Sequence, residues 1–159
     1  QGPASGANAN KIIVPAGQTL YAAGHVIQVV QDQTQTRVTS TTIGYIDTTL
    51  SGSITPKYAN SKILVTVSQH GLDKRSGDTH MGLILYRNGS GIAQPNGQFL
   101  YVGGAGTSTG SAVFSWLDSP ATTAVVTYNT KFSNQNGQGT IAVQWSGATS
   151  TIILQEIAG

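Results

Sequence analysis

The segment between His70 and His80 holds the densest group of chemically active side chains in this sequence of 159 residues. Two carboxylates, Asp73 and Asp78, lie within it, with Arg75 between them. Imidazole and carboxylate groups can bind a metal ion, and two facing carboxyl groups can hydrolyse a glycosidic bond. No tight ligand spacing such as His-x-His supports a metal site. Turn-forming and solvent-exposed roles are therefore the simpler interpretation.

A β-hairpin would place this group at one end of the fold. If Ile63–Gln69 and His80–Arg87 paired as neighbouring strands, the loop Gly71–Thr79 would bring the two histidines near each other. We expect that loop to display its charged side chains to solvent. We expect neither a bound metal nor a cofactor.

A second candidate loop covers Gln94–Gly110 and combines aromatic and amide side chains with flexible glycines. Sugars are recognised by aromatic faces together with planar polar groups, and loops on a rigid scaffold often carry binding residues. The two loops together give six candidate ligand-binding residues: Asp73, Arg75, Asp78, Asn96, Gln98 and Tyr101. The alternative is that both loops are solvated connections.

Several classes of function find no support in the sequence. No Gly-x-Ser-x-Gly motif lies on a strand-to-helix turn, where a serine nucleophile would need it, so we expect no enzyme. Eight Lys and Arg residues against six Asp and Glu give a net charge of +2, and only Lys74 and Arg75 are adjacent. That is too little clustering for nucleic-acid binding.

Cysteine is absent, and no apolar run approaches the ~18 residues of a membrane span. The chain lacks a signal peptide and does not begin with Met, so we expect Gln1 to be an internal residue of a longer protein or a processing point.

Short segments of alternating apolar and polar residues predict an all-β fold. They are rich in β-branched and aromatic residues and bounded by Gly, Pro, Asn, Asp or Ser. We predict an antiparallel jelly-roll β-sandwich of about 8–10 strands. Residues 1–24 are expected to form a linker or arm, with Ile12–Val14 as a possible edge strand, and residues 25–159 the sandwich. The predicted strands are Val26–Val30, Thr41–Ile46, Gly52–Ile54, Ile63–Ser68, Met81–Tyr86, Ala112–Leu117, Ala124–Tyr128, Ile141–Trp145 and Ile152–Ile157.

Alternation also indicates which side chains face the core. Ile141, Val143 and Trp145 share one face of their predicted strand, and Gln144 lies on the other, facing solvent or a subunit. Ala112–Leu117 and Ile152–Ile157 are apolar on both faces and must be covered on both sides. Either a loop or a second subunit covers them. Three-fold association would bury the second face of at least one of them, and we expect a homotrimer.

Charged residues make up 9% of the chain, well below the ~25% of an average soluble domain. Such a polar but nearly uncharged surface is typical of extracellular and virion-exposed β-proteins.

Three stretches resemble the fibre, spike or receptor-binding domains of phages that infect cyanobacteria and marine bacteria. They are Gly24–Val30, Gly52–Val65 and Phe114–Thr123, and the closing run Thr151–Ala158 adds to the likeness. The order of the strands, with an Arg-Asn-Gly turn after Leu83–Tyr86, is also similar to the trimeric jelly rolls of the complement-C1q and tumour-necrosis-factor type.

The resemblance implies a homotrimeric virion head that contacts a host glycan or protein receptor and joins other virion proteins on its N-terminal side. It supplies no catalytic residue. A capsid-decorating or assembly module without a receptor role and a secreted carbohydrate-binding domain remain as alternatives.

Overall fold

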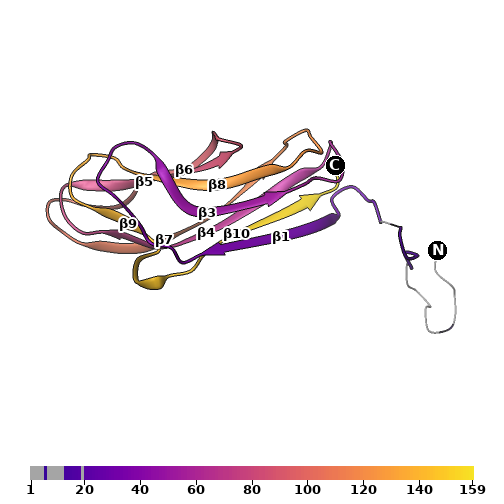
Figure 1. Ribbon diagram of the computed structural model, residues 1–159, viewed down its shortest axis with the longest axis horizontal. Helices are drawn as coiled ribbons and strands as arrows, with labels where there is room; N and C mark the ends of the chain where they lie inside the picture. Colours follow the sequence, from indigo (N-terminus) through magenta and orange to yellow (C-terminus); the bar gives the residue numbers. More distant parts are fainter. Residues whose placement is uncertain (1–5, 7–12, 19) are drawn as a thin grey trace.

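The computed structural model describes residues 6, 13–18 and 20–159 of the chain. Within these residues it is an all-β fold, as the alternation predicts (Figure 1). The elements are β1 (Val26–Thr34), β2 (Val38–Ser40), β3 (Ile46–Ile54), β4 (Lys62–Lys74), β5 (Thr79–Arg87), β6 (Ser90–Val102), β7 (Ser108–Asp118), β8 (Val126–Asn134), β9 (Ile141–Val143), the short 3-10 turn η1 (Trp145–Gly147) and β10 (Ser150–Ile157).

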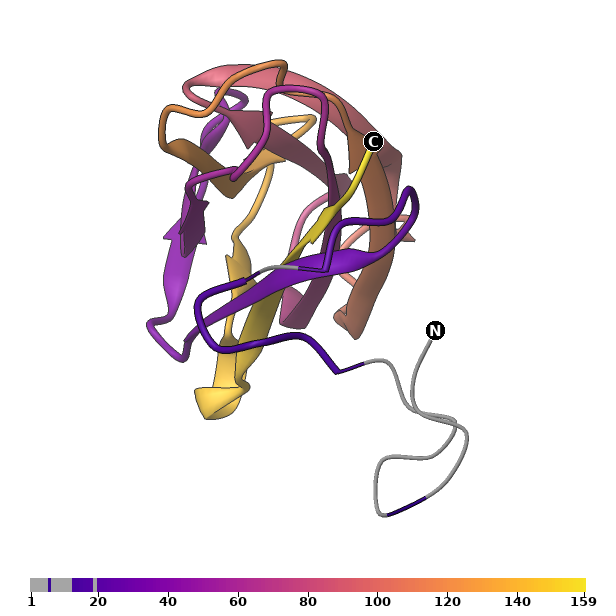
Figure 2. The same ribbon diagram turned by 90° about the vertical axis from the view of Figure 1, so that its right-hand side faces the viewer.

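The strands form two antiparallel sheets packed face to face, which confirms the predicted β-sandwich (Figure 2). One sheet has the order β1-β10-β4-β9-β2, and β7 also pairs with β4. The other has the order β3-β8-β5-β6. Neighbouring strands are therefore mostly distant in the sequence, as in a jelly roll. The predicted turn between β5 and β6 is present, and both Asn88 and Gly89 have positive φ angles, as a tight hairpin requires.

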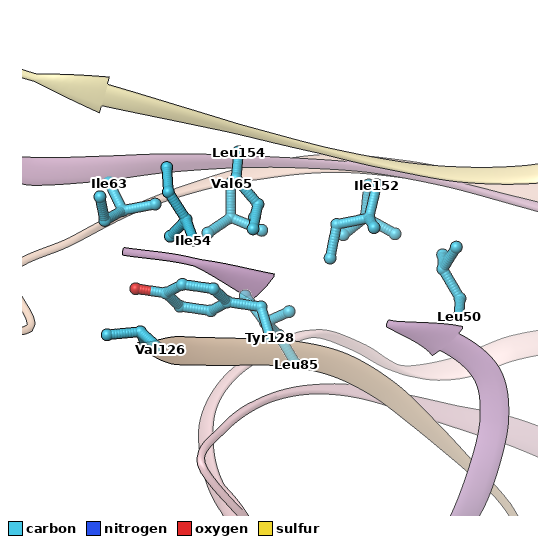
Figure 3. Close-up of a cluster of buried hydrophobic side chains, with 10 residues drawn as sticks. Leu50, Ile54, Ile63, Val65, Leu85, Val126, Tyr128, Ile152 and Leu154 are labelled. Atoms are coloured by element: carbon cyan, nitrogen blue, oxygen red, sulfur yellow. The ribbon is translucent and has the colours of Figure 1, made fainter. Parts of the chain in front are cut away.

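Alternate residues of each strand point between the sheets and divide the core into two apolar clusters. The first, drawn in Figure 3, comprises Leu50, Ile54, Ile63, Val65, Val67, Leu85, Val126, Tyr128, Ile152 and Leu154. The second comprises Leu72, Met81, Leu83, Ala112, Phe132, Ile141 and Val143. All of these side chains are buried, and their removal from water is the main stabilising contribution to the sandwich.

A layer of buried polar side chains separates the two clusters. Gln69 lies between Val67 and Leu72 on β4, and Thr130 lies between the aromatic residues of the two clusters on β8. The Thr130 hydroxyl donates to Gln69 Oε1 at 2.8 Å and also pairs with the hydroxyl of Thr48 on β3. The layer therefore joins the two sheets through hydrogen bonds that only one alignment of the sheets can satisfy.

Two buried carboxylates, Asp118 and Glu156, lie at the end of the sandwich where β4 begins, and both are hydrogen-bonded. Asp118 accepts two hydrogen bonds from Arg87 Nη1, at 3.0 and 2.9 Å, and one from the Tyr128 hydroxyl at 2.7 Å. Burial and the Asp118 carboxylate raise the pKa of Tyr128 well above its usual range. Glu156 accepts from Gln28 Nε2 at 2.6 Å and from the backbone N–H of Lys57 at 2.7 Å.

Burial alone raises the pKa of Glu156, but its hydrogen bonds together outweigh burial, so the pKa lies below its ordinary value. Hydrogen bonds that favour the charged form act in this direction. Glu156 therefore stays ionised within the fold at neutral pH.

Three sequence predictions about the elements were wrong. The hairpin of Ile63–Gln69 with His80–Arg87 does not form, because β4 and β5 belong to different sheets. β4 continues through a bulge between Gln69 and Leu72 to Lys74, and a short link then crosses to the second sheet. Residues 41–45 are not a strand, since β3 begins at Ile46. Trp145 leaves the strand direction after β9 and enters η1.

The segment before β1 is attached to the end of the chain. The Tyr21 hydroxyl donates to the backbone oxygen of Gly159 at 2.5 Å, and its ring packs edge-on against Tyr58 with centroids 4.7 Å apart. Ile13 and Val14, from the segment considered as an edge strand, are not part of a strand. Ile12 and half of the predicted linker or arm, residues 1–5, 7–12 and 19, lie outside the described residues.

Candidate ligand-binding site

The first predicted loop is shorter than expected, and its three candidate residues have different roles. Asp73 is a buried residue of β4 whose Oδ2 accepts from Arg75 Nε at 2.7 Å. Asp78 is exposed, and its backbone oxygen accepts from the Asn136 side chain at 2.9 Å. The two carboxylates are therefore not a facing catalytic pair, because one of them is committed to Arg75.

The prediction of a loop over Gln94–Gly110 was wrong for most of that segment, because residues 94–102 belong to β6. Repeated register irregularities between β5 and β6 explain the misleading sequence pattern. Asn96 and Gln98 are exposed residues of this strand, and Asn96 Oδ1 accepts from the Gln98 backbone N–H at 2.8 Å. Tyr101 is 56% exposed and meets the edge of His80, with ring centroids 6.0 Å apart.

A buried lysine holds the glycine loop that follows β6. Lys74 Nζ donates to the backbone oxygens of Val102 at 2.7 Å, Gly104 at 3.3 Å and Gly106 at 2.8 Å. Its side chain is fully buried, so these three carbonyl groups replace the water that the ammonium group loses. The carbonyl oxygens of this loop therefore face inward to a cation.

Arg75 belongs to a site that the sequence pattern did not reveal. Its guanidinium carbon lies 4.0 Å from the centre of the Trp145 ring, and that of Arg37 lies 3.8 Å from it. We call these three side chains, Arg37, Trp145 and Arg75, the arginine–tryptophan stack. Both guanidinium groups gain a cation–π interaction with the indole. The stack brings together the β1–β2 loop, the η1 turn and the end of β4.

A strained backbone places the indole in this position. Gln144 and Ser146, on either side of Trp145, have φ angles of 53° and 57°. This is a left-handed backbone conformation that residues other than glycine seldom adopt. The bulge of β4 makes room for the turn. A Cβ atom at Gly71 would lie 2.5 Å from the Trp145 backbone nitrogen, so only glycine fits there.

Gln144 ties the three segments together. Its backbone N–H donates to the His70 oxygen at 3.1 Å. We assign its amide orientation from its neighbours: the side-chain nitrogen then donates to the carbonyl oxygens of Thr36 at 3.1 Å and Thr48 at 3.2 Å, and the side-chain oxygen accepts from Ser150 Oγ at 3.0 Å. The side chain is fully buried, contrary to the predicted outward orientation. Thr36 directly precedes Arg37, so these bonds fix both the loop and the turn of the stack.

The stack carries an excess of positive charge. Asp73 pairs with Arg75, whereas Arg37 has no carboxylate partner within the described part of the chain. The two guanidinium carbons can be no more than about 8 Å apart, because both lie near the same ring. At that separation the repulsion is roughly 0.5 kcal/mol in water and ~2 kcal/mol at an effective dielectric constant of 20. Both arginines are exposed, so an anion can reach them.

The two histidines do not form a metal site. His70 Nδ1 lies 2.8 Å from Ser111 Oγ on the neighbouring strand β7, and His80 lies on β5 in the other sheet, beside Tyr101. Over residues 13–18 and 20–159, no three His, Cys, Asp or Glu side chains gather as metal ligands. The same residues contain no helix long and apolar enough to cross a membrane.

Comparison with known proteins gives little more. No protein-family model matches the chain, and no curated protein is similar to it. Among solved structures, a chain of infectious bursal disease virus, Gx strain, matches 99% of this chain at 16% identity, with a TM-score of 0.32. The match covers 41% of that viral chain. A TM-score of 0.32 is too low to support an inference about function.

Proposed function

We propose that this chain is a non-catalytic attachment module of a virion, the head of a trimeric phage fibre or spike that binds a glycan on the host surface. The arginine–tryptophan stack is the observation that carries the proposal. It is an exposed group of planar hydrogen-bond donors on a rigid β-sandwich, held in place by buried hydrogen bonds. The low charge content and the resemblance to phage receptor-binding domains support the virion setting.

The chemistry of the stack favours binding over catalysis. Guanidinium groups remain protonated at physiological pH and offer five N–H donors in a fixed planar arrangement. They therefore hold oxygen-rich ligands but do not exchange protons. The nearest carboxylate, Asp73, is buried and already paired with Arg75, so it is poorly placed to act as a general acid or base.

The outer face of the first sheet supports the homotrimer. One row crosses four strands through Val29, Gln155, Leu64 and Leu117, and Val29 and Leu117 are 57% and 49% exposed. In β1, β10, β7 and the part of β4 up to Ser68, the outward-facing side chains include no carboxylate, and Lys62 at one end is their single Lys or Arg. Copies of this face can therefore approach without repulsion, and association would cover the apolar side chains.

Binding of the purified chain to cells tests this proposal. We expect a fluorescently labelled protein to bind some strains of a panel of cyanobacteria and marine bacteria saturably, as measured by flow cytometry. Periodate oxidation of the cell surface should abolish the binding, whereas protease treatment should not. Multi-angle light scattering at micromolar concentration should give three times the chain mass. A monomer would contradict the trimer, and binding that resists periodate would contradict a glycan receptor.

A further inference from the structure

We infer that the arginine–tryptophan stack recognises an oxyanion, so that the glycan it binds is acidic and carries carboxylate, sulfate or phosphate groups. This inference rests on the proposed function, because it names the class of ligand for the same site. It depends on three observations: the donors left free by the protein, the charge balance, and the covering of the indole.

The protein leaves most donors of the stack unused. Arg75 gives its Nε–H to Asp73, and within the described residues its two terminal nitrogens have no protein acceptor. The side chain of Arg37 has no hydrogen-bond acceptor in the same residues. Carboxylate, sulfate and phosphate groups accept two parallel N–H bonds from one guanidinium group. The guanidinium carbons lie at most about 8 Å apart, so a negative group bound at either arginine is attracted by both charges.

The charge balance favours an anion over a neutral sugar. The site contains two guanidinium groups but a single carboxylate, Asp73, which is buried and paired with Arg75. The exposed part of the site is therefore positive, in a protein whose net charge is only +2. A bound oxyanion would neutralise the unpaired Arg37 and reduce the repulsion between the arginines.

The indole itself is poorly available for stacking on a sugar ring. Both guanidinium groups lie within 4.0 Å of the Trp145 ring centre, where a neutral pyranose would have to pack. Polar side chains nearby can instead hydrogen-bond sugar hydroxyl groups around a bound acid. Gln35, two residues before Arg37, is exposed and donates to Thr149 Oγ1 at 2.7 Å. The exposed Ser146 follows Trp145 directly. The surroundings therefore suit a saccharide that carries a negative group.

The test compares Arg37→Gln with Lys57→Gln in the full chain. Both positions are exposed, and the changes remove the same charge, but Lys57 lies in the link between β3 and β4, beside Glu156 and the start of β4, whereas the stack lies at the end of β4. Arg75 is unsuitable as the principal variant, because its loss would leave the buried Asp73 carboxylate unpaired. The probes are dextran sulfate, polygalacturonate and poly(glycerol phosphate), with neutral dextran and sodium sulfate for comparison. Affinity is measured by isothermal titration calorimetry, and melting curves confirm that the variants fold.

We expect the parent protein to bind at least one acidic polymer and not neutral dextran. Arg37→Gln should weaken this binding about 10–100-fold, the size of a lost charge-assisted hydrogen bond, whereas Lys57→Gln should change it less than about twofold. Arg37→Lys should restore little, because lysine lacks the planar arrangement of donors. The polymer that binds best identifies the acid group, and sodium sulfate shows whether the anion alone suffices.

Three results would overturn the inference: equal weakening by Arg37→Gln and Lys57→Gln, equal binding of neutral dextran, or binding to none of the acidic polymers. The cell assay separates the site from the function. If the parent binds cells and Arg37→Gln binds them equally well, the attachment function stands and the oxyanion site is wrong. If acidic polymers bind through Arg37 but no strain is bound, the site stands and the attachment function is wrong.

Discussion

The polar layer between the two core clusters allows a quantitative prediction for Thr130→Val. Valine has nearly the same shape as threonine, so the change creates no cavity. It removes the hydroxyl that donates to Gln69 Oε1 at 2.8 Å. No other donor reaches that oxygen within the described residues. Thr48 stays paired, because its hydroxyl also lies 3.1 Å from the Thr130 backbone oxygen.

The expected cost follows from the burial of Gln69, whose side chain is completely excluded from solvent. A buried acceptor that loses its donor destabilises a fold by about 1–3 kcal/mol. At the middle of that range, a domain of this size should melt roughly 4–8 °C lower. The double variant Gln69→Leu with Thr130→Val removes both partners. The loss of unfolding free energy in the double variant should therefore be smaller than the sum of the two single losses, by at least about 1 kcal/mol.

Urea denaturation followed by circular dichroism measures these free energies of unfolding. Thr127→Val, three residues earlier on β8, is the matched control, because its hydroxyl pairs with Ser53 Oγ in an exposed position. That substitution should change the free energy of unfolding by no more than about 0.5 kcal/mol in either direction. If Thr130→Val costs no more than Thr127→Val, or if the single changes simply add in the double variant, the layer does not stabilise the alignment of the sheets.

Three further predictions concern other parts of the fold. Gly71→Ala should destabilise the chain by more than ~1 kcal/mol and alter tryptophan fluorescence, because the new Cβ meets the Trp145 backbone; an unchanged spectrum and melting curve would contradict this. The pKa of Glu156 is lowered in the fold, so its contribution is present above about pH 4.3 and is lost as the pH falls through the folded value. Between pH 6 and pH 3 the free energy of unfolding should therefore drop more steeply for the parent than for Glu156→Gln, and parallel curves would exclude the effect. Asp118→Asn should cost about 1.5–3 kcal/mol in urea denaturation, because it removes the charge that Arg87 and Tyr128 bond to; a neutral result would show that solvent replaces both bonds.

Much of the fold could be predicted from the sequence because the strands are short and alternate cleanly. Ile63, Val65 and Val67 face the core as their spacing predicts. The Asn88–Gly89 turn follows from local conformational preference. What local pattern could not predict is the partner of each strand. β4 and β5 look like a hairpin, but the bulge at Gly71 carries β4 onward and the chain then changes sheets.

The site was predicted less well, for a physical reason. Arg75 stands out in the sequence because it is charged and near a turn, but Arg37 stands alone in a polar segment and Trp145 continues a strand-like alternation. Their proximity depends on a left-handed backbone at Gln144 and Ser146, which no residue type there favours. That backbone is set by tertiary contacts, the hydrogen bonds of Gln144 above all. Tyr101 is exposed as predicted, but on a strand and not on a loop.

The buried ammonium group of Lys74 has a consequence for the glycine loop after β6. Inward-facing carbonyl oxygens of this kind are the ligands that proteins otherwise offer to a bound alkali or alkaline-earth ion. Here the cation is part of the polypeptide, so it cannot dissociate, be chelated or exchange with ions in the medium. The carbonyl oxygens of this loop therefore have a cationic partner without recruiting a dissolved ion.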